Sequence, residues 1–114
     1  MAKALTIPVQ TDITSLIERY DTLFFDSFGV LVDGVDALPG AVELVNRMNA
    51  DGVNYFVVTN DASVSLESRV KTFASKGFDI PVERIVNSGS LICGYFAENN
   101  LHSAPTLVLG TRAA

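Results

Sequence analysis

The sequence predicts an α/β fold built on a parallel β-sheet, and three observations support this. Four short apolar segments have the length and composition of strands, helical patterns of apolar residues lie between them, and polar residues follow each strand. Strands that alternate with helices are joined by crossovers, which place them in one parallel sheet with helices on both faces. We therefore expect a three-layer, Rossmann-like arrangement.

The first half of the chain is expected to hold two helices and two strands. Apolar residues recur at helical spacing over 12–20, which predicts a short amphipathic helix. The apolar run "TLFF" predicts a strand at 22–25, and a loop rich in glycine and aspartate follows it. A second helix is expected over 39–51, where Gly52 ends it. The segment "VNYFVVTN" then predicts a strand at 53–60.

The second half repeats this alternation. A helix is expected over 65–77, with Ser65 or a nearby serine as its N-cap. The segment "RIVNS" predicts a strand at 84–88, and "GSLICGYFAENN" predicts a core-facing helix at 89–100. The apolar segment "PTLVLG" predicts a fourth strand at 105–110. The pattern shows no repeat and no linker, so one domain is expected.

The composition restricts the class of protein and its partners. Of the 114 residues, 48% are apolar and 18% are charged, which is typical of a folded globular chain. The net charge of −5 argues against binding to nucleic acid or to an anionic membrane. No apolar run approaches the roughly 18 residues of a membrane span. The single cysteine, Cys93, cannot form an internal disulfide, so we expect a cytoplasmic protein.

Polar residues at the predicted strand ends are the candidate site. Ligands of open parallel sheets bind outside the carboxyl ends of the strands. Asp26 ends the first strand, and Thr59 and Asn60 end the second. Any one of these residues alone could simply begin a loop or cap a helix. Because neighbouring strands share a rim, Asp26 and Thr59 together predict a carboxylate and a hydroxyl at one site.

Two motifs resemble those of a known family. The segments "LFFDSFGVLVDG" and "FVVTNDAS" resemble the first two motifs of the haloacid dehalogenase (HAD) superfamily. The closer likeness is to its class IIA phosphatases, the nagD-like and 4-nitrophenylphosphatase-like group. The resemblance covers residues 22–111. It implies that residues 1–114 are the N-terminal part of a HAD-like core, incomplete and ending where a cap insertion is expected to begin.

The resemblance also implies roles for individual residues. Asp26 would be the nucleophile that forms an aspartyl-phosphate, and it would bind Mg²⁺ together with the backbone carbonyl of Phe28. Thr59 would be the second catalytic residue, donating its hydroxyl to the transferred phosphoryl group. The residues expected to hold phosphate oxygens are Ser27, Phe28, Gly29, Thr59 and Asn60. The substrate would be a small phosphorylated metabolite, such as a sugar phosphate or a nucleotide.

The sequence departs from this family at Phe28. Typical members have an aspartate two positions after the nucleophile, where it protonates the leaving group and activates water, a contribution of roughly 10²–10⁴-fold. Phenylalanine cannot transfer a proton. An alternative function is therefore a catalytically impaired relative that binds a phosphorylated ligand or a protein partner. A phospho-acceptor receiver domain is a further alternative, but it would place its acceptor after the third strand, which here ends in "VNS".

The second departure is that later family motifs are missing. No lysine follows Lys76, and no acidic motif that could complete a Mg²⁺ site follows it either. We therefore expect a fragment of a phosphatase that is inactive alone, whose partner is the C-terminal part of the same protein. Family topology would leave the strand at 22–25 as an exposed sheet edge. A homodimer is left open by the sequence.

Overall fold

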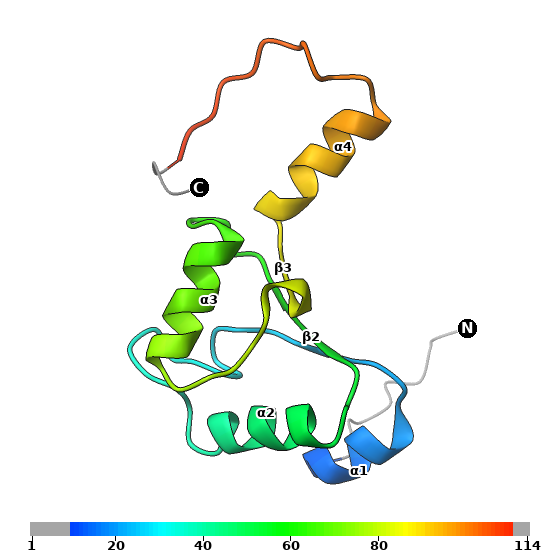
Figure 1. Ribbon diagram of the computed structural model, residues 1–114, viewed down its shortest axis with the longest axis vertical. Helices are drawn as coiled ribbons and strands as arrows, with labels where there is room; N and C mark the ends of the chain where they lie inside the picture. The colour runs from blue at the N-terminus through cyan, green and yellow to red at the C-terminus, as the bar shows by residue number, and fades with distance from the viewer. Residues whose placement is uncertain (1–9, 111–114) are drawn as a thin grey trace, which may run out of the picture.

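The computed structural model describes residues 10–110 and contains a parallel sheet of three strands (Figure 1). The strands are β1 (Leu23–Phe25), β2 (Tyr55–Thr59) and β3 (Ile85–Asn87), and their order in the sheet is β1-β2-β3. In the register, Phe25 lies opposite Val57, and Val57 lies opposite Ile85. The predicted parallel α/β architecture is confirmed, and β1 forms an edge of the described sheet, as expected.

Helices occupy the segments between the strands. They are α1 (Ile13–Arg19), α2 (Ala41–Ala50), α3 (Leu66–Ser75) and α4 (Ile92–Glu98), with 3₁₀ turns η1 (Val82–Arg84) and η2 (Gly89–Leu91). The side chain of Ser65 accepts the amide hydrogen of Ser68, so it caps α3 as predicted. Within residues 10–110, no helix has the length and apolar content needed to cross a bilayer.

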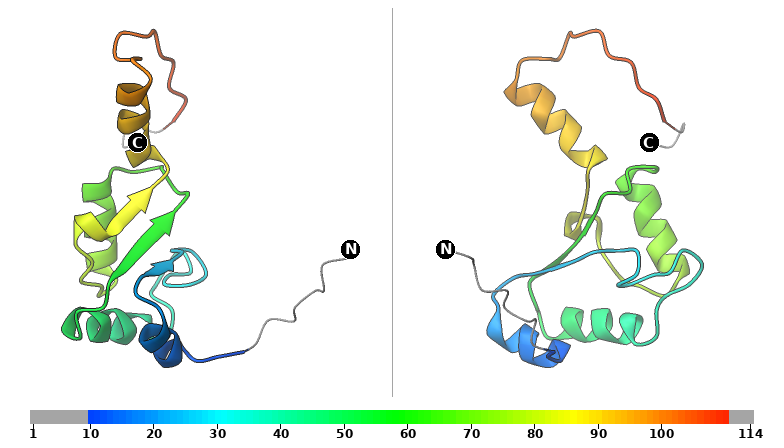
Figure 2. Two further views of the ribbon diagram at one scale, coloured as in Figure 1. Left: turned by 90° about the vertical axis from the view of Figure 1, so that its right-hand side faces the viewer. Right: turned by 180° about the vertical axis from the view of Figure 1, so that it is seen from behind.

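The core lies on one face of the sheet. Because the strand order advances in one direction, right-handed crossovers bring α2 and α3 to the same side, and Figure 2 shows α3 on one side of the strands. Side chains from both helices and all three strands form one buried cluster there, which includes Val45, Met48, Phe73, Phe25, Tyr55, Val57 and Ile85. This packing fixes the strands, and with them the residues at their carboxyl ends.

The opposite face of the sheet is open in the described part of the chain. Side chains alternate along each strand, so Phe24 and Val58 point away from the core, and they are 73% and 40% exposed. Phe24 packs against Phe56 of the neighbouring strand, with ring centroids 5.9 Å apart. The described residues therefore form two layers of the expected three, and the prediction of an incomplete core stays a prediction.

Two predictions about residues 89–110 are wrong. The helix expected to face the core begins as the 3₁₀ turn η2, and α4 then extends away from α2 and the sheet (Figure 1). Leu91 of η2 and the α4 residues Ile92 and Tyr95 are exposed. Residues 105–110 form no strand, and Leu107 is 84% exposed. An apolar pattern becomes a strand or a buried helix only when another element packs against it, and none of the elements described between residues 10 and 110 does so here.

Candidate functional site

Asp26 lies at the rim of the sheet, directly after β1. Phe25 is buried and anchors the strand, whereas Asp26 is exposed. Its Oδ1 atom accepts the amide hydrogen of Ser27 at 2.7 Å, which orients the carboxylate without enclosing it. A carboxylate held in this way remains accessible to a ligand that approaches the carboxyl ends of the strands.

The chain then makes a tight turn over residues 27–32. The carbonyl of Ser27 accepts amide hydrogens from Leu31 and Val32, at 2.9 and 3.1 Å. Gly29 has φ +77°, a conformation that glycine adopts easily, and its amide donates to the carbonyl of Val32 at 2.7 Å. Ser27, Phe28 and Gly29 of this turn are expected to hold phosphate oxygens, but the backbone amides of Ser27 and Gly29 already donate within the protein. They would have to exchange these partners to bind phosphate.

Phe28 is the exposed residue of this turn. Its side chain is 70% exposed and adds nothing to the core. Its backbone amide and carbonyl make no hydrogen bond within the part of the chain that the structure describes. Both groups are therefore free for a ligand. This agrees with the expectation that the carbonyl could bind a cation, although the role itself stays a prediction.

Thr59 ends β2, and it lies beside the same cavity as Asp26. This cavity, of about 400 Å³, is lined by Asp26, Val58, Thr59, Asn60, Val86, Asn87, Ser88 and Leu91. The Thr59 side chain is nearly buried, and its Oγ1 atom accepts the amide hydrogen of Asp61 at 3.2 Å. A hydroxyl that accepts one hydrogen bond still has its own proton to donate. The structure thus brings the two predicted catalytic residues to one site.

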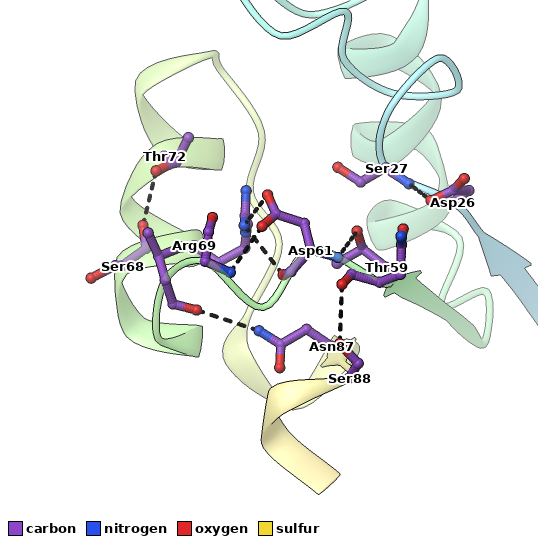
Figure 3. Close-up of polar contacts among 12 residues, drawn as sticks. Asp26, Ser27, Thr59, Asp61, Ser68, Arg69, Thr72, Asn87 and Ser88 are labelled. Carbon is purple, nitrogen blue, oxygen red and sulfur yellow. Dashed lines mark hydrogen bonds and ion pairs between the residues drawn. The ribbon is translucent and has the colours of Figure 1, made fainter. Parts of the chain in front are cut away.

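The loop after β2 is held from two sides (Figure 3). On one side, Arg69 of α3 forms an ion pair with Asp61, with 2.6 Å between Nη2 and Oδ2. Hydrogen bonds from the Ser63 side chain and backbone, together with Arg69, lower the pKa of Asp61 to about 2. On the other side, the Ser88 hydroxyl donates to the carbonyl of Asn60 at 3.0 Å. The loop that carries Asn60 is therefore fixed relative to both α3 and β3.

From the sequence, Asp61 is one of the polar residues at the end of the second strand but has no assigned role, and Arg69 is not identified as part of this site, although one signal was present. Leu66, Val70 and Phe73 repeat at the spacing that forms one helix face, and Arg69 lies on that same face. A charged residue on an apolar helix face requires a partner, because an unpaired buried charge is strongly unfavourable. The nearby Asp61, eight residues earlier, was the available candidate.

The residues at this site are of the type that binds Mg²⁺, but there are too few of them to complete its coordination. Mg²⁺ binds oxygen ligands in octahedral geometry, and the Asp26 carboxylate and the Phe28 carbonyl are such ligands. Among residues 10–110, however, no group of three or more His, Cys, Asp or Glu side chains could hold a metal ion. These residues do not form a complete metal site by themselves.

Comparisons with known proteins agree with this geometry. The sequence model of the haloacid dehalogenase-like hydrolases matches residues 23–114. Glycerol-3-phosphate phosphatase of Mus musculus is 36% identical over 67 residues, which are 59% of this chain and 21% of that protein. A possible sugar phosphatase of the HAD superfamily from Cytophaga hutchinsonii has 34% identity and a TM-score of 0.73, over 88% of this chain and 35% of that one.

A third relative is a structure with a metal ion. The glycerol phosphate phosphatase from Mycobacterium tuberculosis, in complex with calcium, has 26% identity and a TM-score of 0.64. The match covers 86% of this chain and 28% of that one. The chain thus spans about a third or less of the length of these relatives. The family match covers most of the sequence and includes both motifs at the rim, and we conclude that the chain belongs to the haloacid dehalogenase-like hydrolases.

Proposed function

We propose that this chain provides the nucleophile and one phosphoryl-binding hydroxyl of a Mg²⁺-dependent HAD-type phosphatase. The observation that carries the proposal is that Asp26 is exposed at the end of β1 and shares a cavity with Thr59 at the end of β2. A carboxylate beside a hydroxyl with a free proton is the arrangement that an aspartyl-phosphate mechanism needs.

The chemistry of this chain's own residues follows from that arrangement. A carboxylate oxygen of Asp26 attacks phosphorus, the bond from phosphorus to the ester oxygen breaks, and that oxygen leaves with the bonding electrons. Thr59 donates a hydrogen bond to a phosphoryl oxygen as negative charge redistributes, with the Asn60 amide beside it. Mg²⁺, when bound, would reduce the repulsion between the two anions. It would require ligands in addition to Asp26 and the Phe28 carbonyl.

The names of the relatives support a small phosphorylated metabolite as the substrate. Two of the proteins described above are phosphatases of glycerol phosphate, and the third is a possible sugar phosphatase. We therefore propose a sugar phosphate, a nucleotide or a metabolite of similar size for the protein that contains this chain. We also propose a cytoplasmic location, and the C-terminal part of the same protein as the partner that completes the site.

Phe28 supports a second candidate function, a catalytically impaired relative that binds a phosphorylated ligand. The side chain lies exposed on the turn after Asp26 and cannot transfer a proton. The aspartate that typically stands at this position would protonate a poor leaving group and activate water for the second step. Phe28 can do neither. Phosphorylation of Asp26 by a substrate with a good leaving group does not need that proton.

The experiment that tests these functions uses an aryl phosphate and the protein that contains this chain, with Mg²⁺. We expect a burst of aryl alcohol followed by a slow steady rate, because the aspartyl-phosphate forms faster than it is hydrolysed. Asp26→Asn should abolish the burst, and Phe28→Asp should raise the steady rate. If the protein shows no burst and no turnover, and Phe28→Asp restores neither, the enzyme proposal is wrong and the binding function is favoured.

The chain of 114 residues taken alone should bind Mg²⁺ weakly and show negligible phosphatase activity. Its described residues offer one carboxylate and one carbonyl at the site, whereas Mg²⁺ is held by several oxygens. Isothermal titration calorimetry with MgCl₂ measures this directly. Tight binding that is lost in Asp26→Asn would contradict this expectation.

A further inference from the structure

We propose that Arg69 is a positioning residue for the hydroxyl of Thr59, and that it acts through Asp61. This inference rests on the proposed function, because Thr59 is there assigned to the phosphoryl group. Arg69 lies on α3 and has no place in the two family-like motifs. The structure connects it to the site by two successive contacts, which Figure 3 shows.

The first contact fixes Asp61. The Nη2 atom of Arg69 lies 2.6 Å from Oδ2 of Asp61 and 3.4 Å from its backbone carbonyl oxygen. The Arg69 side chain is only 13% exposed, whereas that of Asp61 is 47% exposed. Arg69, the better buried of the two, therefore holds both the side chain and the backbone carbonyl of Asp61. These contacts restrain the Asp61 side chain and the peptide unit that follows it.

The second contact passes this restraint to Thr59. The amide of Asp61 donates to Oγ1 of Thr59 at 3.2 Å. A hydroxyl has two acceptor sites and one proton, so occupying one acceptor site limits the directions in which the proton can point. Threonine is β-branched and has few accessible χ1 rotamers, so the amide of Asp61 favours one of them. The hydroxyl is then oriented before any ligand arrives, which is the condition for effective electrostatic stabilisation.

One other contact acts on Asp61: the amide of Ser63 donates to its Oδ1 atom at 2.9 Å, but this contact lies within the loop and does not tie it to another element. Ser88 donates to the carbonyl of Asn60 at 3.0 Å, and the Asn87 side chain donates to the carbonyl of Val64 at 3.4 Å. Both are neutral hydrogen bonds, and neither involves Asp61 or Thr59. Among the described residues, the ion pair with Arg69 is the charged contact that acts on the residue bonded to Thr59.

Arg69 is also a poor choice for stability alone. Its Nε atom is buried and has no hydrogen-bond partner among the described residues. A buried donor without a partner is unfavourable, and an apolar residue would fit the helix face occupied by Leu66, Val70 and Phe73. A positioning role accounts for a cationic side chain here, because its Nη2 atom holds both the carboxylate and the backbone carbonyl of Asp61.

The test uses the 114-residue chain with Arg69→Ala and the conservative Arg69→Lys. Lys71→Ala is the matched control, since Lys71 is an exposed basic residue of the same helix. The first readout is NMR of the ligand-free protein, namely the χ1 couplings of Thr59 and the hydrogen exchange of the Asp61 amide. We expect Arg69→Ala to average the Thr59 rotamers and to speed exchange of the Asp61 amide at least about tenfold. Arg69→Lys should restore much of both.

The second readout uses the protein that contains this chain and is a titration with inorganic phosphate in the presence of Mg²⁺, followed at the Thr59 and Asp26 amides. Arg69→Ala and Thr59→Val should each weaken phosphate binding about tenfold, as expected for the loss of one hydrogen bond to a charged group. The double variant should be no weaker than Thr59→Val, because both changes remove the same interaction. Asp61→Asn, which keeps the backbone amide, tests the ion pair if Arg69→Ala does not fold.

The outcomes separate this inference from the proposed function. If Arg69→Ala and Asp61→Asn both leave the Thr59 rotamer and the Asp61 exchange as in Lys71→Ala, the positioning role is wrong. If the wild-type protein that contains this chain shows no phosphate-dependent shift that Asp26→Asn removes, the phosphoryl site is wrong instead. The ligand-free NMR measurements still decide the positioning role in that case.

Discussion

Val57 and Val58 are neighbours in β2 that face opposite sides of the sheet, and they allow a matched test of the fold. Val57 is fully buried beneath α2 and α3, whereas Val58 is 40% exposed on the open face. The substitutions Val57→Ala and Val58→Ala remove the same two methyl groups from the same strand. Any difference in their effect on stability therefore reports how each face is packed.

The expected magnitudes follow from burial. Removing two buried methyl groups at Val57 costs about 1.6 kcal/mol in transfer free energy, and the cavity left behind raises the total to about 2–3 kcal/mol. At Val58 the lost burial is smaller and no closed cavity forms, so we expect about 1 kcal/mol. The loss of β-propensity is common to both and cancels in the difference. Val57→Ala should thus be more destabilising by about 1–2 kcal/mol.

Urea unfolding followed by far-UV circular dichroism measures these free energies, provided that the m-values of both variants match that of the wild type. Equal losses for Val57→Ala and Val58→Ala would refute the reasoning, because they would show that the outer face is packed as closely as the core. Repeating the experiment at a higher protein concentration then tests whether a second copy of the chain packs on the outer face, since such association makes the stability concentration-dependent.

Three further predictions concern the loops around the site. Gly29→Ala should lower stability by about 1–2 kcal/mol from backbone strain, since the added Cβ meets nothing within 4 Å at φ +77°; thermal unfolding measures this. Gly89→Ala places a Cβ 3.1 Å from that of Ala62, so we expect a loss of about 1 kcal/mol that Ala62→Gly relieves. The pKa of Asp61 is lowered from 3.8 to about 2, so the free energy that the ionised carboxylate adds to folding is present above pH 3.8 and is lost as the pH falls toward 2. We expect this contribution to be about 1 kcal/mol, because the carboxylate is half exposed. Asp61→Asn should remove this part of the dependence of stability on acid.

Each of these predictions has an outcome that would contradict it. Gly29→Ala with unchanged stability would mean that the turn relaxes away from positive φ at no cost. For Gly89, a double variant with Ala62→Gly that is no more stable than Gly89→Ala would exclude the steric explanation. An unchanged stability profile between pH 4 and 2 in Asp61→Asn would show that the ion pair with Arg69 contributes nothing measurable in solution.

The sequence alone determined the order and type of most elements, because these depend on local patterns. Apolar runs of four or five residues, N-cap serines and glycines at helix ends act within one or two turns of chain, and they predicted β1, β2, β3 and helices α1, α2 and α3. The same local reasoning placed Asp26 and Thr59 at strand ends, and parallel pairing then required them to share a rim.

Only the tertiary structure decided what each apolar segment packs against. The segments at 89–100 and 105–110 have the composition of buried elements, yet α4 extends from the sheet and 105–110 forms no strand, because no described element lies against them. The pairing of Asp61 with Arg69 was likewise not predicted from the sequence. Contacts between separate elements depend on how those elements meet in space, and the spacing of residues along one chain does not contain that information.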